Sequence, residues 1–126
     1  MSPALTHLYA GVPVSDLEAG IAWYTRFFGR PADTRVGDEV VWEINDRATL
    51  FIEPNAAHAG SGRITFAVTG LDAFVEWLDA QQIERQPIEA YSNGVRHVMI
   101  PDPDGNAIAF AEPPGEAATG REAPAE

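Results

Sequence analysis

Two stretches of the sequence resemble each other: residues 14–24 read VSDLEAGIAWY, and residues 68–78 read VTGLDAFVEWL. Both open on a β-branched residue and a hydroxyl residue and continue into a run with helical spacing of apolar side chains. Such self-similarity within one chain indicates a duplicated structural unit. The matching pairs are Val14/Val68, Ser15/Thr69, Leu17/Leu71, Glu18/Asp72, Ala19/Ala73, Ile21/Val75 and Trp23/Trp77.

The first stretch carries signals for both ends of a helix. Ser15 is expected to cap its N-terminus, with Glu18 three residues later completing a capping box. Gly29 and Pro31 are expected to end it. Apolar side chains recur between these signals at Leu17, Ile21, Tyr24 and Phe28.

A second echo lies further along the chain. Residues 50–54 read LFIEP and residues 109–113 read AFAEP, and the second copy also contains PDPDGN, a strong hairpin turn in which Gly105 supplies a positive φ. Around these landmarks each copy reads as strand, helix and three strands. The predicted strands are Leu8–Val14, Asp33–Val36, Glu39–Asn45, Ala48–Glu53, Arg63–Val68, Gln86–Ala90, Val95–Ile100 and Asn106–Glu112, and the second helix is predicted over Leu71–Gln81.

The predicted fold is therefore α+β, with two tandem βαβββ modules. The first module spans residues 4–54 and the second spans residues 62–114. Residues 55–61, NAAHAGS, form a polar linker between them. Residues 115–126 show no apolar periodicity and are predicted to be a disordered tail.

Composition excludes several classes of function. The 126 residues include no cysteine, which rules out disulfide scaffolds, thiolate metal sites and thiol catalysis. No apolar run is long enough for a membrane-spanning helix, and the N-terminus does not resemble a signal peptide. We therefore expect a cytoplasmic protein without a membrane partner.

The charge balance is strongly acidic. Eight arginines face nineteen acidic residues, for a formal net charge of −11, and there is no lysine. Because the arginines are scattered along the chain, nucleic-acid binding is not expected. An acidic surface suits a cationic ligand, although most acidic proteins are merely soluble.

Together these motifs resemble the vicinal oxygen chelate superfamily, which includes glyoxalase I, extradiol dioxygenases, fosfomycin-resistance enzymes and bleomycin-resistance proteins. The resemblance covers residues 4–114 and is carried by VSDLEAGIAWYxxFFG at 14–29, IEP at 52–54 and DPDGN at 102–106. It implies that the two modules form curved mixed sheets around a shared cleft. The fold hosts several chemistries, so it does not decide function.

The resemblance also implies where a metal ion would be held in the metal-dependent members. Those positions fall on Tyr9, Leu50, Arg63 and Ala109 here. Leucine and alanine have no donor atom, arginine repels a cation, and tyrosine is only an occasional ligand. We therefore expect no metal and no cofactor. His7, two residues before Tyr9 and on the same strand face, could restore one ligand but not the other three.

The same positions become candidates for ligand recognition. Tyr9 and Arg63 are predicted to face each other across the cleft, where they could bind a ligand or pair with each other or with an acid. The resemblance to bleomycin-resistance proteins implies a ligand contact near Tyr91. The candidate ligand-binding residues are Tyr9, Trp42, Glu43, Leu50, Arg63, Tyr91, Arg96 and Ala109.

Trp42 and Glu43 point to opposite faces of one strand, so only one of them can line the cleft. A two-residue turn before the next strand would set Glu43 on the face of Leu50, and a three-residue turn would exchange the two assignments. We favour Glu43 in the cleft, with Trp42 packed against the helix.

The function that this resemblance favours is a metal-free small-molecule-binding protein that sequesters an aromatic or cationic natural product or antibiotic. The alternative is a metal-dependent glyoxalase-, epimerase- or dioxygenase-like enzyme of the same superfamily. A third possibility is a metal-free enzyme that uses Arg63, Tyr9 or Glu43. The modules could pair within one chain or across a dimer, and we expect a homodimer.

Overall fold

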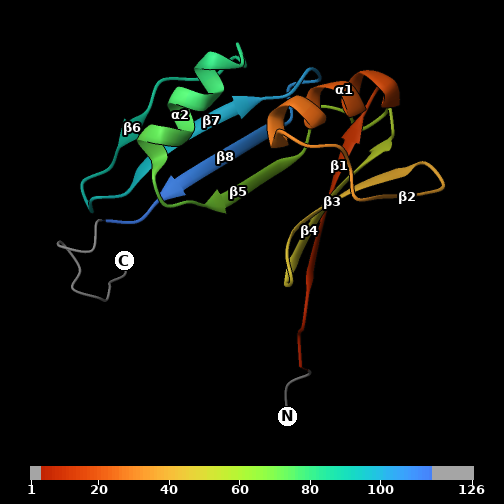
Figure 1. The fold of residues 1–126 in the computed structure, drawn as a ribbon, viewed down its shortest axis with the longest axis horizontal. Coiled ribbons are helices and arrows are strands. Elements are labelled where there is room, and N and C mark those ends of the chain that lie inside the picture. The colour runs from red at the N-terminus through yellow and green to blue at the C-terminus, as the bar shows by residue number, and fades with distance from the viewer. Residues whose placement is uncertain (1–3, 115–126) are drawn as a thin grey trace. The chain divides into compact units, whose positions relative to one another are not determined.

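A computed structural model describes residues 4–114, in which each half of the chain forms a four-stranded sheet and one helix (Figure 1). The tail predicted over residues 115–126 lies outside the described residues. The first half contains β1 (Leu8–Val14), α1 (Leu17–Phe28), β2 (Thr34–Val36), β3 (Glu39–Asn45) and β4 (Ala48–Pro54). The second contains β5 (Arg63–Ala67), α2 (Leu71–Ala80), β6 (Glu89–Ala90), β7 (Arg96–Pro101) and β8 (Ala107–Glu112). The predicted α+β fold of two tandem βαβββ modules is confirmed.

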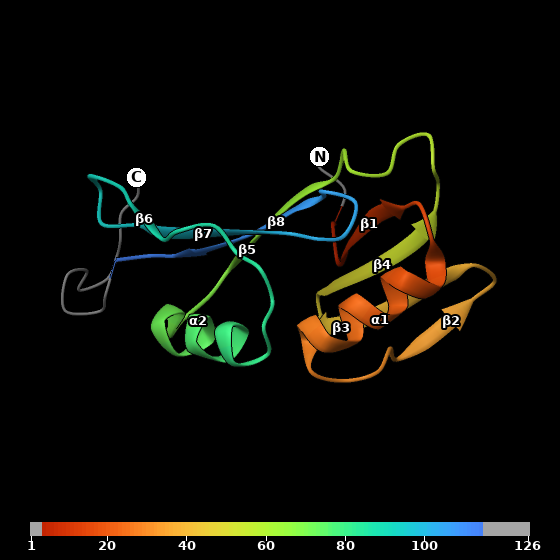
Figure 2. The same ribbon diagram turned by 90° about the horizontal axis from the view of Figure 1, so that it is seen from above.

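The two sheets share one topology. Their strand orders are β1-β4-β3-β2 and β5-β8-β7-β6. In each sheet the first strand pairs in parallel with the last, and the other pairs are antiparallel. A helix lies over one face of each sheet, as Figure 2 shows for α2 and the second sheet. Both sheets are therefore mixed. The last strand of each module runs parallel to the first, and the remaining neighbours are joined by hairpins and run antiparallel.

The chain divides into two units that we describe separately. Unit 1 comprises residues 4–62 together with the turn Asp102–Asn106, and unit 2 comprises Arg63–Pro101 and residues 107–114. The predicted second module thus contributes its hairpin turn to unit 1.

Hydrogen bonds hold this turn in unit 1. The Asp102 side chain is 4 % exposed and accepts from the backbone N–H groups of Asp104 and Asn106, from the Asn106 amide and from the Tyr24 hydroxyl at 2.8 Å. Asn106 also donates to the carbonyl of Pro13. Burial and the Asp102 carboxylate raise the pKa of Tyr24 far above its usual range.

The first helix begins one residue later than its capping box predicts. Asp16 is the N-cap, and its carboxylate accepts from the backbone N–H of Ala19 at 3.0 Å. The predicted cap, Ser15, instead donates its hydroxyl to Asp104 at 2.5 Å. Asp104 is thus the partner that competes for the Ser15 hydroxyl. The helix ends as predicted at Gly29, whose φ of 73° lies in the left-handed region.

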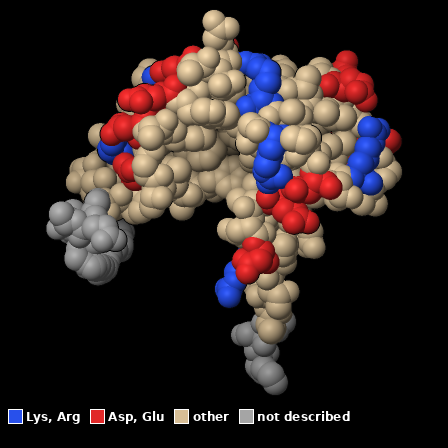
Figure 3. Space-filling model, in the orientation of Figure 1, with Lys and Arg blue, Asp and Glu red and all other residues tan. Residues whose placement is uncertain are grey.

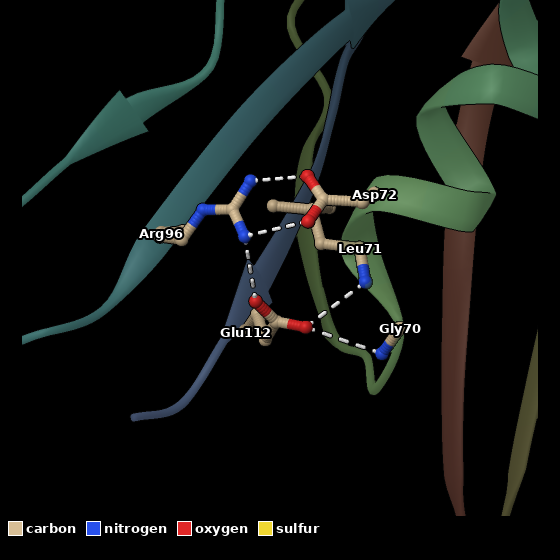
Figure 4. Close-up of polar contacts among 5 residues, drawn as sticks. All are labelled: Gly70, Leu71, Asp72, Arg96 and Glu112. Carbon is tan, nitrogen blue, oxygen red and sulfur yellow. Dashed lines mark hydrogen bonds and ion pairs between the residues drawn. The ribbon is translucent and has the colours of Figure 1, made fainter. Parts of the chain in front are cut away.

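The second helix has a different N-terminal cap, because Gly70 stands where the first copy has Asp16. Glu112 on β8 supplies the missing carboxylate: it accepts from the backbone N–H groups of Gly70 and Leu71 at 3.1 and 2.9 Å (Figure 4). A side chain distant in sequence thus stabilises the helix start and its dipole.

Each helix packs against one face of its own sheet and forms the core there. The fully buried side chains of unit 1 include Val12, Val14, Tyr24, Trp42, Leu50 and Ile52. Those of unit 2 include Leu71, Leu78, Val98, Ile100 and Ile108. None of the helices in residues 4–114 is long and apolar enough to cross a membrane.

Candidate ligand-binding groove

The pairing register assigns the side chains of the first sheet to two faces. Tyr9 on β1 pairs with Thr49 on β4, which pairs with Glu43 on β3. Side chains paired in this way share a face, and their sequence neighbours point to the opposite one. The face that carries Tyr9, Thr49 and Glu43 is opposite to the face under α1, and it is the open face of this sheet.

A groove of about 580 Å³ lies on this open face. Its lining combines three ring side chains, three carboxylates and a few small polar or aliphatic groups. It is formed by His7, Tyr9, Thr34, Val36, Glu39, Val41, Glu43, Asn45, Asp46, Thr49 and Phe51. All of these residues belong to unit 1, so the groove is a property of that unit alone.

One end of the groove is ordered by a histidine and a threonine. The Nε2 atom of His7 lies 2.7 Å from the Thr49 hydroxyl, and Thr49 is itself 5 % exposed. The imidazole also stacks at a tilt on the Tyr9 ring, with a centroid distance of 4.5 Å. These contacts hold the ring of His7, just before β1, next to that of Tyr9 on β1, and Tyr9 remains 67 % exposed.

The carboxylates lie on and beside β3. Glu39 and Glu43 belong to this strand and Asp46 follows it. Since no arginine is among the described lining residues, nothing in this lining neutralises the three acids. The groove therefore has the electrostatics of a site for a cation.

An ion pair outside the groove fixes the backbone of Glu43. Asp33 accepts from the Glu43 N–H at 2.7 Å, and Arg30 donates to the Glu43 carbonyl at 2.5 Å and to Asp33 at 2.7 Å. The hydrogen bonds from Arg30 and from the Glu43 N–H hold the pKa of Asp33 below its usual range. Both peptide groups of this position are thus bound, which orients the strand next to its bulge between Glu43 and Asn45.

Glu43 lies on the groove side of β3 and Trp42 on the helix side, which is the arrangement that the sequence favoured. Trp42 is fully buried, and its indole N–H donates to the carbonyl of Arg30 at 3.1 Å. The expectation that Glu43 shares a face with Leu50 is wrong, however. The β-bulge shifts the register, so that Trp42 is the residue paired with Leu50.

Leu50 accordingly lies outside the groove. It is fully buried on the face that α1 covers. Its predicted counterpart Ala109 pairs with Thr65, on the open face of the second sheet that also carries Arg63. The two positions are therefore not equivalent. The similarity of LFIEP and AFAEP does not match the strand pairing. In that pairing Tyr9 lies beside Thr49 and its counterpart Arg63 beside Ala107, so Thr49 and Ala107 are the equivalent positions.

The remaining predicted residues belong to unit 2. Arg96 forms ion pairs with Asp72 at 2.5 Å and with Glu112 at 3.4 Å on the helix side of its sheet (Figure 4). Asp72 raises the pKa of Arg96, and two carboxylates already satisfy this guanidinium. Tyr91, in contrast, is 45 % exposed and stacks on His97 with centroids 5.7 Å apart. Since Tyr9 and Arg63 lie in different units, their predicted opposition stays a prediction.

Sequence reasoning misses most of the groove lining. Thr49 and Phe51 are missed because Leu50 is predicted to lie in the cleft, and the neighbours of a residue in a strand point to the opposite face. The alternation of β3 is a signal that could find Glu39 and Val41, since both share the face of Glu43. His7 stands out in the sequence only as a possible metal ligand.

The side chains present do not fit a divalent metal ion. Of the positions that the resemblance suggested, Leu50 lies on the helix-covered face outside the groove, Ala109 lacks a donor atom and Arg63 is cationic. Within residues 4–114 no three His, Asp or Glu side chains are grouped so as to hold a metal. His7, the histidine that the sequence offered as a ligand, shares a hydrogen bond with the Thr49 hydroxyl.

Fold and groove together define a small α+β protein with duplicated βαβββ modules, and comparisons with known proteins assign its family. Residues 5–110 match the Glyoxalase/Bleomycin resistance protein/Dioxygenase superfamily. A glyoxalase/bleomycin resistance protein from Catenulispora acidiphila is 37 % identical, with a TM-score of 0.80 over 86 % of this chain and 99 % of that chain. The chain belongs to this superfamily.

More distant solved structures share the fold. A lactoylglutathione lyase from Agrobacterium tumefaciens is 20 % identical, with a TM-score of 0.72 over 88 % of this chain and 96 % of that chain. A bleomycin-binding protein complexed with bleomycin is 16 % identical, with a TM-score of 0.69 over 87 % of this chain and 98 % of that chain. A search of curated proteins gave no match.

Proposed function

We propose that this chain is a metal-free binding protein that sequesters a planar, cationic small molecule in the groove of unit 1. The observation that carries the proposal is the composition of the groove: rings from His7, Tyr9 and Phe51 beside carboxylates from Glu39, Glu43 and Asp46. Rings offer faces for stacking and for cation–π contact, and carboxylates accept charge-assisted hydrogen bonds. An antibiotic or another aromatic natural product with a positive charge has this chemistry.

The whole-chain charge supports the same class of ligand. A formal net charge of −11 attracts cations over a distance and raises their association rate, an effect that salt screens. Figure 3 shows both acidic and arginine side chains on the surface in this view. A charge-assisted contact to a groove carboxylate would add about 1–3 kcal/mol of binding free energy.

Binding without turnover is the mechanism that this donor set supports. The groove can remove water from a flat ring and pair its charge, and both effects favour binding. Each bound molecule is withdrawn from solution, so the free ligand concentration falls in proportion to the amount of protein. No three His, Asp or Glu side chains of the described residues are grouped so as to hold a metal ion, so we derive no reaction step through a metal.

The test is a calorimetric titration with four probes. Proflavine is a planar cation, spermidine is a cation without a ring, naphthalene-1-sulfonate is a planar anion, and bleomycin is the ligand of the distant bleomycin-binding protein. We expect proflavine to bind more tightly than spermidine and naphthalene-1-sulfonate, and its affinity to fall as salt is added. Tighter binding of the planar anion, or no binding of any planar cation, would overturn the proposal.

We also propose that the chain forms a homodimer. Strand β1 is an edge of its sheet, and the exposed apolar residues on and before it include Leu5 at 89 % and Leu8 at 67 %. Apolar side chains on an unpaired edge are typical of surfaces that a second chain covers.

A further inference from the structure

Phe51, one of the aromatic residues that line the groove, closely approaches a glycine on the neighbouring strand. Gly11 on β1 is the direct pairing partner of Phe51 on β4. A Cβ atom placed on Gly11 would lie 2.6 Å from Cζ of Phe51 and 2.9 Å from its Cε2. Both distances are shorter than van der Waals contact allows, so the far end of the ring occupies the place of a side chain at position 11.

This contact fixes the direction in which the ring leans. Strand β4 lies between β1 and β3, and Phe51 pairs with Gly11 on one side and with Val41 on the other. Because its tip lies over Gly11, the ring leans across β1 and away from Val41. Phe51, Val41 and Glu43 all line the groove, and the Phe51 ring leans to the β1 side of it.

We infer that Gly11 is a positioning residue for the ligand: its lack of a side chain holds the Phe51 ring flat across β1 as a stacking platform, on which a flat ring system lies with its positive charge toward Glu43. The inference rests on the proposed function and narrows its ligand class from planar cations in general to those with fused or extended ring systems. A ligand with an extended ring face binds such a platform more tightly, because the stacking energy increases with the overlap of the two π-systems.

The backbone itself does not require glycine here. The φ of Gly11 is outside the left-handed region, unlike that of Gly37 or Gly105. The atoms that an alanine methyl would meet belong to the free end of a rotatable side chain, so the ring can move away. Gly11→Ala is therefore expected to fold and to push the Phe51 ring toward the groove.

The experiment is a double-mutant cycle with calorimetric titration of proflavine. The variants are Gly11→Ala, Phe51→Leu and the double variant, since leucine lacks the ring atoms that reach Gly11. We expect Gly11→Ala to weaken proflavine binding by about three- to tenfold. In the Phe51→Leu background the same change at Gly11 is expected to have no further effect, because the ring that it displaces is gone.

Gly20→Ala is the matched control. Its methyl would lie 3.1 Å from Cδ1 of Ile52 on the helix-covered face of the same sheet, and we expect it to leave proflavine affinity unchanged. Thermal melting of each variant separates folding from binding. A second readout is NMR: the Phe51 ring is expected to shift the Hα signals of Gly11, and Phe51→Leu to abolish that shift.

The outcomes distinguish this inference from the function on which it rests. If the wild-type chain binds proflavine and folded Gly11→Ala binds it equally well, the inference is wrong and the proposed function stands. The inference is also overturned if Gly11→Ala weakens proflavine binding equally in the wild-type chain and in Phe51→Leu, since the effect would then not depend on the Phe51 ring. If the wild-type chain binds no planar cation, the proposed function fails and the inference falls with it.

Discussion

At the scale of single residues, Glu43 is a groove carboxylate whose backbone is held on both sides by side chains. Its N–H and C=O groups are bound by Asp33 and Arg30, so its side chain starts from a fixed position on β3. Fixed donors and acceptors lose less conformational entropy on binding than mobile ones. We therefore assign it a larger share of cation binding than Asp46, which lies beyond the strand.

Glu43→Gln is expected to weaken proflavine binding by about 1 kcal/mol, or about fivefold in Kd, because the amide keeps the shape and removes the charge. Calorimetry measures the change. Glu18→Gln is the control: it alters net charge equally, but Glu18 lies in the first turn of α1, which covers the opposite face of the same sheet. Equal loss in both variants would show that long-range attraction, and not contact, accounts for the effect.

A second residue-scale prediction concerns the turn that unit 1 receives from the second half of the chain. Asp102 is buried and accepts from both Tyr24 and Asn106. Asp102→Asn brings N–H donors against these two donors, and we expect a loss of about 1–3 kcal/mol in the free energy of unfolding. Urea unfolding tests it, with Tyr24→Phe, which removes one donor only, as the milder comparison. An unchanged unfolding midpoint in Asp102→Asn would contradict this assignment.

At the scale of elements, α2 is tied to two strands through its N-terminus. Glu112 on β8 caps the helix, and Arg96 on β7 bridges Glu112 and Asp72 (Figure 4). Hydrogen bonds from Arg96 hold the pKa of Asp72 below its usual range. A carboxyl group whose pKa is lower in the folded state than in the unfolded chain stabilises the folded state at pH values above its pKa in the unfolded chain. This stabilisation is lost as the pH falls through the pKa of the group in the folded state.

For these ion pairs we predict that the free energy of unfolding differs between the wild-type chain and Arg96→Met, and that this difference depends on pH. We expect the wild type to be the more stable at pH 7, and the difference to shrink as pH falls below about 3.9, the ordinary pKa of aspartate. Denaturant unfolding at several pH values measures it. A difference that stays constant down to acid pH would mean that Arg96 acts through packing of its aliphatic chain and not through Asp72.

The elements are largely predictable because each carries local signals. Helical spacing, Gly29 and the DPDGN turn lie within a few residues of the boundaries that they set. The errors come from contacts and pairings that the local pattern does not set. Ser15 loses its capping role because its hydroxyl binds Asp104, and Leu50 is paired with Trp42 and not with Glu43 because of a bulge between Glu43 and Asn45. Neither Asp104 nor the bulge leaves a trace in the sequence around the residue that it affects.

The groove is predictable only in part for the same reason. Tyr9 can be found through the family resemblance, and Glu43 through the alternation of β3, although its expected partner Leu50 lies on the other face. The close approach of Gly11 and Phe51 depends on the parallel pairing of β1 with β4. That pairing joins segments separated by a helix and two strands, and no local pattern reports its register.

At the scale of the whole molecule, the homodimer is the prediction that the exposed apolar residues of unit 1 support. Static light scattering at micromolar concentration is expected to give the mass of two chains. A dimer of this kind would bury about 2,000 Å² or more in total. Leu8→Glu is expected to weaken the dimer, since it sets charges on an edge strand. A wild-type chain that scatters as a monomer would contradict the proposal.

The central claim is that the groove binds a planar cation by itself, without a metal ion. The measurement that tests it most directly is a proflavine titration before and after exhaustive treatment with a chelator, with metal analysis of both samples. We expect the same Kd in both samples, and less than about one tenth of a divalent ion per chain before treatment. Stoichiometric metal in the untreated protein, together with binding that disappears on chelation and returns with the ion, would contradict the claim.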